Sequence, residues 1–584
     1  MTDTTTQQPD ASTPEDGVPA STAASGRPTD EHGGQAVLRS AVAHGVDTVF
    51  TLSGAHVFPV YDAAVIADPP VRLLDVRHEQ TAVFAAEGYA KLTRTPGFAV
   101  VTAGPGVTNA VSAVTTAWFN GTPLLVLGGR APDYRWGTGS LQELDQPPLL
   151  APVTKAASTV HDVHELGRAT DEALALATAP HRGPVFLDVP MDTLFSRTPL
   201  PDAGTEPAAV AGRRGGPGLA VQQPDPDAVA RVAARIAAAR RPVLVLGSDV
   251  WTGGADRAAA DLVAQTGLPV VPNGMARGIL PPSHRSLVTR ARGTAFGTAD
   301  LVVVVGTPLD FRLGYGQFGG KDGAPAAEVV HVVDAADQVS THASPVDHLA
   351  GDLSTTLDAL ASSLHDGLHP EATEWARTLR SAHEAALARD TDLLRSDAEP
   401  LHPARIYGEL VPRLADDAVV IGDGGDFVSF AGRFVEPARP GGWMDPGPYG
   451  CLGTGLGYAI AARLARPSSQ VVLLLGDGAA GFSLMDVDTL VRHGLPVVMV
   501  CGNNSAWGLE KHPMRMLYGY DVITDLGAAR YDEVVRALGG AGETVTSPAT
   551  LGAALDRAFA SGVPYLVNVL TDPEIPYPRT TTGI

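Results

Sequence analysis

Short apolar runs recur along the chain, and each of them ends at or just before a glycine, a proline or an aspartate. In chain order they are GFAVVTAGPG, PLLVLGGR, GPVFLDVP, RPVLVLGSD, ADLVVVVGTP, AEVVHVVDA, AVVIGDGGD, VVLLLGDG and LPVVMVCGNN. Stretches with helical periodicity lie between them. Because the runs are continuous and do not alternate with polar residues, they are typical of parallel strands that helices cover on both faces. The pattern predicts an α/β protein with three doubly wound parallel-sheet domains.

Changes in composition give the expected domain boundaries. Residues 1–30 and 201–226 contain few large apolar side chains, so they cannot offset the entropy cost of ordering. We expect the first to be a disordered arm and the second a linker. A charged, alanine-rich segment at 366–402 predicts a linker helix. The expected domains are residues 31–200, 227–365 and 403–584, the last with a C-terminal tail.

Composition narrows the possible partners and the compartment. The 584 residues include 64 Asp or Glu and 42 Lys or Arg, a formal net charge of −22, which disfavours a nucleic-acid partner. Apolar runs such as Leu301 to Val305 are far shorter than the ~20 residues that cross a bilayer, so we expect no membrane partner. Cys451 and Cys501 are the two cysteines, which argues against a zinc site or a disulfide framework. Without a secretory pattern at the N-terminus, we expect a cytoplasmic protein.

Two strand ends in the last third of the chain carry candidate metal ligands. Gly476-Asp477-Gly478 follows the run VVLLL, and Asn503-Asn504 follows the next run, VVMVCG. Carboxylate and amide oxygens suit Mg²⁺, and glycines let backbone amides approach a diphosphate. Each motif alone could be an ordinary polar turn. Their occurrence after consecutive strands predicts a metal–diphosphate site.

This pair of motifs resembles the thiamine diphosphate (ThDP) binding motif, which implies that ThDP and Mg²⁺ are the cofactors. The resemblance implies three metal ligands: the side chains of Asp477 and Asn504 and the backbone carbonyl of Ala506. It also implies cofactor contacts at Gly424, Gly425, Asp426, Phe427, Gly478, Ala479, Trp507 and Gly508, and at Asn109 in the first domain.

Two more residues match positions that this family uses. Glu79, in RHEQTAVFAAEGYAK, would hydrogen-bond the aminopyrimidine ring and so promote loss of the proton from thiazolium C2. The alternative is a glutamate at a helix N-terminus that pairs with Arg77. Leu452, between Gly450 and Gly453, matches the apolar wedge that bends the cofactor, and the alternative is a leucine of the core.

The resemblance covers nearly the whole chain after the arm and is closest to the branch of acetolactate synthases, oxalyl-CoA decarboxylases and 2-hydroxyacyl-CoA lyases. Residues 457–460 (GYAI) and the loop 141–146 (LQELDQ) are similar to the CoA enzymes. The oxalyl-CoA decarboxylases carry Tyr-Glu where this chain has Leu141-Gln142. We therefore expect a lyase that cleaves 2-hydroxyacyl-CoA to formyl-CoA and a ketone or aldehyde.

Three residues are candidates for the reaction itself. Glu510 would take the 2-hydroxyl proton if burial raises its pKa, and the alternative is an ion pair with Lys511 or Arg515. His56 lies in a loop that borders the thiazolium in this family and is expected either to orient substrate or to cap a helix. Gln142 matches a residue at the active-site mouth of acetolactate synthases, as Lys155 does, so neither separates the two reactions.

The resemblance also bears on the central domain and on assembly. That domain holds FAD in acetolactate synthases and ADP in the CoA enzymes. In such a site Asp334 would accept a hydrogen bond from a ribose hydroxyl, and the phosphates would be bound by Arg290, Arg292 and Arg312. Glu79 and the diphosphate site belong to different subunits in the family. We therefore expect a homodimer or a homotetramer.

Two other functions remain open. One is an acetolactate synthase-like carboligase or decarboxylase that acts on pyruvate or another 2-oxo acid. The other is a non-catalytic regulator with the same fold, against which the intact Glu79, Asp477 and Asn504 argue. In each catalytic alternative the partner is a small molecule, either an acyl-CoA or a 2-oxo acid.

Overall fold

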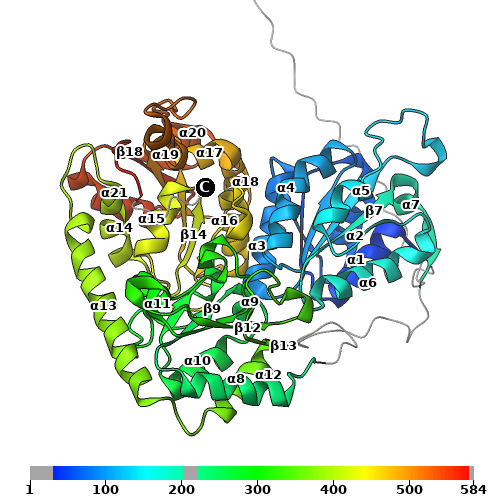
Figure 1. Ribbon diagram of the computed structural model, residues 1–584. Helices are drawn as coiled ribbons and strands as arrows, with labels where there is room; N and C mark the ends of the chain where they lie inside the picture. Colours follow the sequence, from blue (N-terminus) through cyan, green and yellow to red (C-terminus); the bar gives the residue numbers. More distant parts are fainter. Residues whose placement is uncertain (1–29, 201–220, 578–584) are drawn as a thin grey trace, which may run out of the picture.

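The computed structural model describes residues 30–200 and 221–577. They form three α/β domains, coloured blue to cyan, green, and yellow to red in Figure 1. Each apolar run of the sequence forms a strand, and all neighbouring strands in the three main sheets of this part of the chain are parallel. The predicted fold class is confirmed. Most of the expected arm and linker, and residues 578–584 of the expected tail, lie outside the described residues.

The first domain contains a six-stranded sheet. Its strand order is β3 (Arg72–Asp75), β2 (Thr48–Thr51), β4 (Gly97–Val101), β5 (Leu124–Arg130), β7 (Pro184–Pro190) and β6 (Ala157–Thr159). Its helices are α1 (Gly33–Ala43), α2 (Phe58–Ile66), α3 (Glu79–Thr93), α4 (Pro105–Phe119), α5 (Pro147–Leu150), α6 (Leu166–Thr178) and α7 (Met191–Phe195). The ends of the domain are joined, because β1 (Asp30–His32) pairs antiparallel with β8 (Arg197–Pro199).

The central domain contains a five-stranded sheet. Its order is β10 (Val270–Pro272), β9 (Pro242–Leu246), β11 (Leu301–Val305), β12 (Glu328–Val333) and β13 (Asp347–Ala350). Its helices are α8 (Pro226–Ala238), α9 (Ser248–Thr252), α10 (Asp256–Thr266), α11 (Arg292–Thr298) and α12 (Leu353–Ser363). The long helix α13 (Pro370–Leu394) leads from it to the third domain and lies within the segment expected to be a linker helix.

The third domain contains a second six-stranded sheet. Its order is β15 (Trp443–Met444), β14 (Val419–Asp423), β16 (Val471–Gly476), β17 (Val498–Asn503), β19 (Tyr565–Leu570) and β18 (Ala541–Val545). Its helices are α14 (Pro403–Leu410), α15 (Asp426–Phe434), α16 (Thr454–Ala465), α17 (Asp477–Ser483), α18 (Val487–Arg492), α19 (Gly508–Tyr518), α20 (Tyr531–Ala537) and α21 (Pro548–Ala560).

The first and third domains share a core through α3 and α16, which face each other in Figure 1. Small residues allow this approach: a Cβ at Gly88 would lie 2.9 Å from the ring of Tyr458. A buried ion pair lies in the interface, because Lys91 Nζ is 2.8 Å from Glu87 Oε1. The Tyr458 hydroxyl donates to Glu87 Oε2 at 2.9 Å and accepts from Lys91 at 3.0 Å. Charged groups therefore help to align α3 with the third domain.

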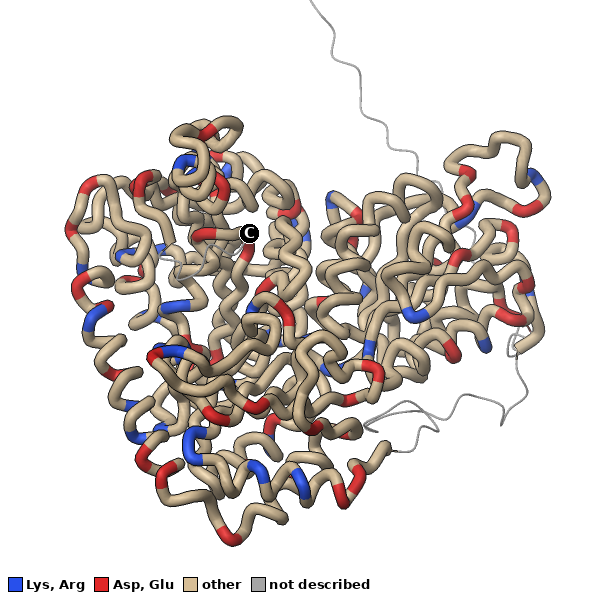
Figure 2. Tube along the Cα trace, viewed as in Figure 1, with Lys and Arg blue, Asp and Glu red and all other residues tan. Residues whose placement is uncertain are grey.

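Charge is distributed over all three domains. Figure 2 shows acidic and basic positions on each of them, with both signs along α13 at the left edge. No helix in residues 30–200 or 221–577 combines the length and the apolar character needed to cross a membrane.

Candidate active site

The two predicted metal-binding side chains lie at the ends of neighbouring strands. Gly476 of β16 is in register with Gly502 of β17, so Asp477 and Asn504 follow at the same edge of the sheet. Asp477 Oδ2 is buried and has no hydrogen-bond partner among the described residues. An unpartnered buried carboxylate oxygen is costly unless a cation or a donor binds it. This atom therefore fits the predicted Mg²⁺.

The turn after β17 faces the same carboxylate. Burial raises the pKa of Asp477 to about 6, while the amide of Gly478, which donates to Asp477 Oδ1 at 3.0 Å, and the nearby amides of Ser505 and Ala506 oppose that rise. Ser505 has a φ of 53°, and the side-chain oxygen of Asn504 accepts from the amide of Ala506 at 3.1 Å. Asp477, Asn504 and Ala506 are thus brought together. Their roles as ligands stay a prediction.

The two asparagines have different surroundings. Asn503 is buried, and its side-chain amide donates to Asn568 Oδ1 at 3.1 Å. This hydrogen bond links β17 to β19. Asn504 is only half-buried and lies beside the turn at Gly508. The second asparagine is therefore the one available to the site.

Glycines let three strand-end loops converge at this edge. Gly424 has a φ of 119°, and a Cβ there would lie 3.3 Å from the amide nitrogen of Gly476. A Cβ at Gly508 would lie 2.9 Å from Asp426 Oδ2 and 3.1 Å from Asn504 Nδ2. Glycine is therefore needed for these loops to pack closely, and it leaves their backbone amides without side chains of their own that could cover them, as diphosphate binding by backbone groups requires. The predicted cofactor fits this set of loops.

Aromatic and aliphatic side chains close the remaining sides of the loops. A Cβ at Gly478 would lie 2.4 Å from the ring of Trp507, and one at Gly425 would lie 2.2 Å from Leu509. Phe427 is buried, with its ring under Gly502. Only the backbone of Phe427 is therefore placed to contact a diphosphate, whereas the ring of Trp507 lies over Gly478. Ala479 is buried and would touch a Cβ at Gly424, so it too lies at this edge.

Asp423 supports the loop that carries Leu452. Its carboxylate accepts from the amides of Gly453, at 3.0 Å, and Gly455, at 2.8 Å. Burial raises the pKa of Asp423 to about 6 although these amides oppose the shift. Sequence reasoning missed this residue. The signal that could have found it is the similarity of IGDGG to LLGDG, since each places an aspartate at a buried strand end.

Leu452 lies where the first and third domains meet. A Cβ at Gly453 would lie 2.8 Å from Phe482 of α17 and 3.1 Å from the side chain of Gln80 on α3. Leu452 is half-buried, and the preceding Gly450 has a φ of 69°. The loop therefore lies between the two domains, as the wedge interpretation requires.

Glu79 is the first residue of α3 and is buried, with 7% of its surface exposed. Asn109 Nδ2 of α4 donates to Glu79 Oε2 at 3.0 Å. The suggested partner Arg77 instead lies 3.4 Å from Asp488, and its amide donates to Asp486 Oδ1 at 2.7 Å. A buried carboxylate that is hydrogen-bonded by one neutral amide can still accept a hydrogen bond from a second donor.

Asp486 fixes the start of α3 from the third domain. Besides accepting from the Arg77 amide, its carboxylate accepts from the Thr81 hydroxyl at 2.6 Å. Within one chain, the N-terminus of α3 is therefore hydrogen-bonded to the third domain. Assembly of the site from two subunits stays a prediction.

The remaining candidates lie on the first domain and on α19. His56 is buried, its Nδ1 lies 3.0 Å from the Thr102 hydroxyl, and burial lowers its pKa. Gln142 has a φ of 62° and is half-buried against Gly104.

Glu510 is in the first turn of α19 and is exposed, so it lacks the burial that its proposed role as a base requires. Of the two cations considered as partners of Glu510, Lys511 pairs with Asp525, and Arg515 pairs with Asp521 and Glu574.

The strand ends of the central domain differ from the expected nucleotide site. His181 Nδ1 of the first domain lies 2.9 Å from Asp334, and these two meet Asp249 with all ligand atoms within 4.8 Å of one another. Burial lowers the pKa of His181, but the carboxylates of Asp249 and Asp334 outweigh it and raise the value to about 9. The Asp334 carboxylate is therefore already bound by protein.

The three arginines expected to bind phosphates are also engaged. Arg290 pairs with Asp390, Arg292 donates to the carbonyl of Arg312, and Arg312 pairs with Asp310 at 2.7 Å. In this arrangement the side chains present do not fit FAD or ADP at the strand ends. No step of the reaction is therefore assigned to a nucleotide in that domain.

Comparison with known proteins gives a consistent result over most of the chain. Three models of thiamine pyrophosphate enzymes (thiamine pyrophosphate is ThDP) match: the N-terminal TPP binding domain at residues 31–149, the central domain at 229–360 and the C-terminal TPP binding domain at 423–569. The chain is 50% identical over 553 residues to acetolactate synthase large subunit IlvG of Mycobacterium tuberculosis, covering 94% of this chain and 97% of that protein.

A second group of relatives has another printed activity. 2-Hydroxyacyl-CoA lyase 2 of Caenorhabditis elegans is 34% identical over 549 residues, and that of Homo sapiens is 33% identical over 548 residues. Each alignment covers 88% of this chain and 84% of the relative. The chain therefore belongs to the thiamine pyrophosphate enzyme family, in the branch that contains acetolactate synthases and 2-hydroxyacyl-CoA lyases.

Proposed function

We propose that the protein is a ThDP- and Mg²⁺-dependent carboligase of the acetolactate synthase type, acting on pyruvate or another 2-oxo acid. The observation that carries this proposal is the 50% identity to an acetolactate synthase across nearly the whole of both chains. The lyases are 33–34% identical over a smaller share of this chain. The comparisons thus favour the reaction that the sequence patterns placed second.

This order differs from the expectation drawn from the GYAI and LQELDQ patterns. Those stretches are short, and the loop at residues 141–146 is fixed by structural contacts of its own. Gln146 Oε1 accepts from the Gly104 amide at 2.7 Å, and its amide donates to the Gly129 carbonyl at 2.9 Å. Similarity there reflects how the loop packs as much as what it binds.

The lyase remains the second candidate because the relatives at 33–34% identity carry that name. Its proposed base, Glu510, is exposed on α19. The proposed role requires burial, which an exposed side chain does not have. The residue that set the lyase apart is therefore poorly placed for its task in this chain.

The side chains of this protein can be assigned tasks in the carboligation. ThDP, when bound, supplies a carbon nucleophile that adds to a carbonyl and accepts the electrons left by decarboxylation. Glu79, held by Asn109, would accept a hydrogen bond from the pyrimidine ring. Asp477, Asn504 and Ala506 would hold Mg²⁺ against the diphosphate. Leu452 would support the bent cofactor between the two domains.

Two assays on one preparation separate the candidate reactions. Purified protein with ThDP and Mg²⁺ is given pyruvate in one arm and a panel of 2-hydroxyacyl-CoA esters in the other. We expect acetolactate from the first arm and no formyl-CoA from the second. Formyl-CoA release without acetolactate would replace the carboligase with the lyase, and Glu510→Gln would then test whether that residue is its base.

A further inference from the structure

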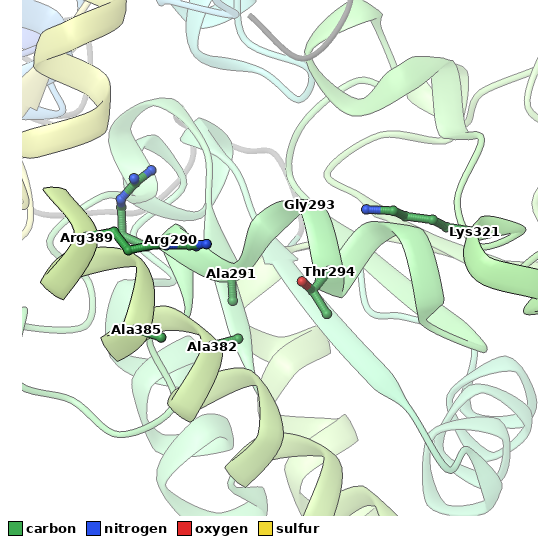
Figure 3. Close-up of a pocket in the computed structure, with 8 residues that line it drawn as sticks. All are labelled: Arg290, Ala291, Gly293, Thr294, Lys321, Ala382, Ala385 and Arg389. Carbon is green, nitrogen blue, oxygen red and sulfur yellow. The ribbon is translucent and has the colours of Figure 1, made fainter. Parts of the chain in front are cut away.

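A cavity of about 470 Å³ lies between the central domain and α13, and every charged side chain that lines it is cationic. These side chains are Arg290, Lys321 and Arg389. Figure 3 shows Lys321 extending toward Gly293 from one side, with Arg290 and Arg389 on the other. The chain as a whole carries a net charge of −22, so this concentration of positive charge runs against its composition. We call it the cationic cavity.

Positive charge in the cationic cavity is incompletely balanced by the protein. Lys321 and Arg389 are exposed, and the described residues give neither of them a hydrogen bond or an ion pair. Arg290 pairs with Asp390, but Asp390 is shared with Arg433 of α15. The Nε of Arg290 is buried without a hydrogen-bond partner in this part of the chain. Two exposed, unpaired cations beside a guanidinium that is fixed by Asp390 are suited to an anion.

The remaining lining selects the kind of anion. Ala291, Ala382 and Ala385 form an inert wall that leaves space between the cations. Thr294 adds a hydroxyl, which can donate to an oxyanion. The lining contains no aromatic ring on which a base could stack and no carboxylate to accept a ribose hydroxyl. A compact polyanion therefore fits better than a nucleotide.

The cationic cavity is separate from the sites described above. The strand-end crevice of the central domain is closed by His181, Asp249 and Asp334, none of which lines the cavity. The predicted metal ligands do not line it either. Its nearest link to the ThDP site is the Arg290–Asp390–Arg433 series, since Arg433 is on the helix that begins at Asp426.

We propose that the cationic cavity binds a compact small molecule bearing two phosphate groups. Lys321 and Arg389 supply two separated cations, and Arg290 adds a second guanidinium. These groups match two phosphates better than one, because guanidinium and ammonium groups each bind phosphate oxygens directly. The net field of the protein repels anions, so affinity must come from these local contacts. This inference does not depend on which reaction the enzyme performs.

Isothermal titration of the holoenzyme, saturated with ThDP and Mg²⁺, tests the proposal with fructose 1,6-bisphosphate as the probe. We expect saturable binding that weakens as salt is added, because exposed charge contacts are screened. Arg389→Ala and Lys321→Ala should each raise the Kd at least about tenfold, the loss of one charge-assisted contact. Arg377→Ala is the matched control, since Arg377 is on the same helix but pairs with Glu374 and does not line the cavity.

Two results would overturn the proposal. One is absence of saturable binding by the parent protein, or equal affinity in the parent and both cavity variants. The other is ADP binding about tenfold or more tightly than the bisphosphate, which would require a base-binding surface that the lining lacks. Because all three substituted side chains are exposed, the variants should fold, and their circular dichroism spectra check this.

Discussion

At the scale of single residues, Glu79 carries the most specific chemical assignment. It is buried at the start of α3 and is hydrogen-bonded by Asn109 and not by Arg77. We expect Glu79→Gln to retain ThDP but to slow proton exchange at thiazolium C2 by about 10²–10⁴-fold, the range for loss of a general acid–base group. Hydrogen–deuterium exchange followed by NMR measures this rate.

Glu31→Gln is the control for that substitution. Glu31 is also buried in the first domain, but it pairs with Arg39 at 2.9 Å and lies in β1, at the start of the domain. Its substitution should leave C2 exchange unchanged. An unchanged exchange rate in Glu79→Gln would remove Glu79 from the mechanism.

Some residues of the site could be predicted and others could not. Asp477 and Asn504 follow apolar strands directly, so their meeting at one sheet edge follows from parallel pairing. Asp423 and Asp486 were missed because their importance comes from amides donated by distant segments, at Gly453 and Arg77. The sequence marks Asp423 only through the similarity of IGDGG to LLGDG, and it does not show which amides these two carboxylates bind.

At the scale of elements, the packing of α3 on α16 depends on a buried ion pair. Lys91→Met should leave Glu87 buried without its cation, a change that typically costs about 3–5 kcal/mol. We expect a clear fall in thermal stability. Replacing both partners, Lys91→Met with Glu87→Gln, should recover much of it, because no charge is left unpaired and the amide oxygen can still accept from Tyr458. Calorimetry on the two variants decides this, and an equal loss in both would contradict it.

The contact between the first and central domains should depend on pH through His181. Asp249 and Asp334 raise the pKa of His181 to about 9, against an ordinary value of 6.5. Protonated His181 therefore stabilises the folded state fully below about pH 6.5, and this contribution is lost as pH rises through about 9. Burial raises the pKa of Asp249 to about 7, so Asp334 is the carboxylate that stays charged across this range: His181 and Arg182 outweigh burial there and lower its pKa.

The variant His181→Gln isolates this contribution. We expect its Tm to lie below that of the parent near pH 6.5 and the difference to vanish near pH 10, as the sign of the linkage requires. His365→Gln, at an exposed position of the central domain, is the control. A Tm difference that stays constant between these pH values would contradict the role of His181.

At the scale of the whole molecule, the active site is expected to need two subunits. If Glu79 of one chain serves the diphosphate site of another, Glu79→Gln and Asp477→Ala should complement each other. Co-expression of the two inactive variants should give hybrid dimers with one intact site, and about a quarter of parental activity for random pairing in a symmetric dimer. Activity of the co-expressed mixture is the measurement. Inactive hybrids would place both residues in one chain's site.

Much of the fold, but less of its assembly, could be predicted. The strands that are continuous apolar runs were evident, because such runs are typical of parallel strands covered on both faces, whereas strands such as β2 and β3 lie outside those runs. The closure of the central strand ends by His181 was not evident, because it joins residues 153 positions apart, at 181 and 334. The short patterns GYAI and LQELDQ pointed to the lyase, whereas identity over 553 residues gives more weight to the acetolactate synthase.

The central claim is that this chain converts pyruvate to acetolactate with ThDP and Mg²⁺. NMR of ¹³C-labelled pyruvate incubated with the purified protein tests it most directly, with either cofactor omitted in parallel samples. The account predicts labelled acetolactate and carbon dioxide in the complete mixture and almost none without ThDP. Unchanged pyruvate in the complete mixture, or acetolactate formed equally well without ThDP, would contradict it.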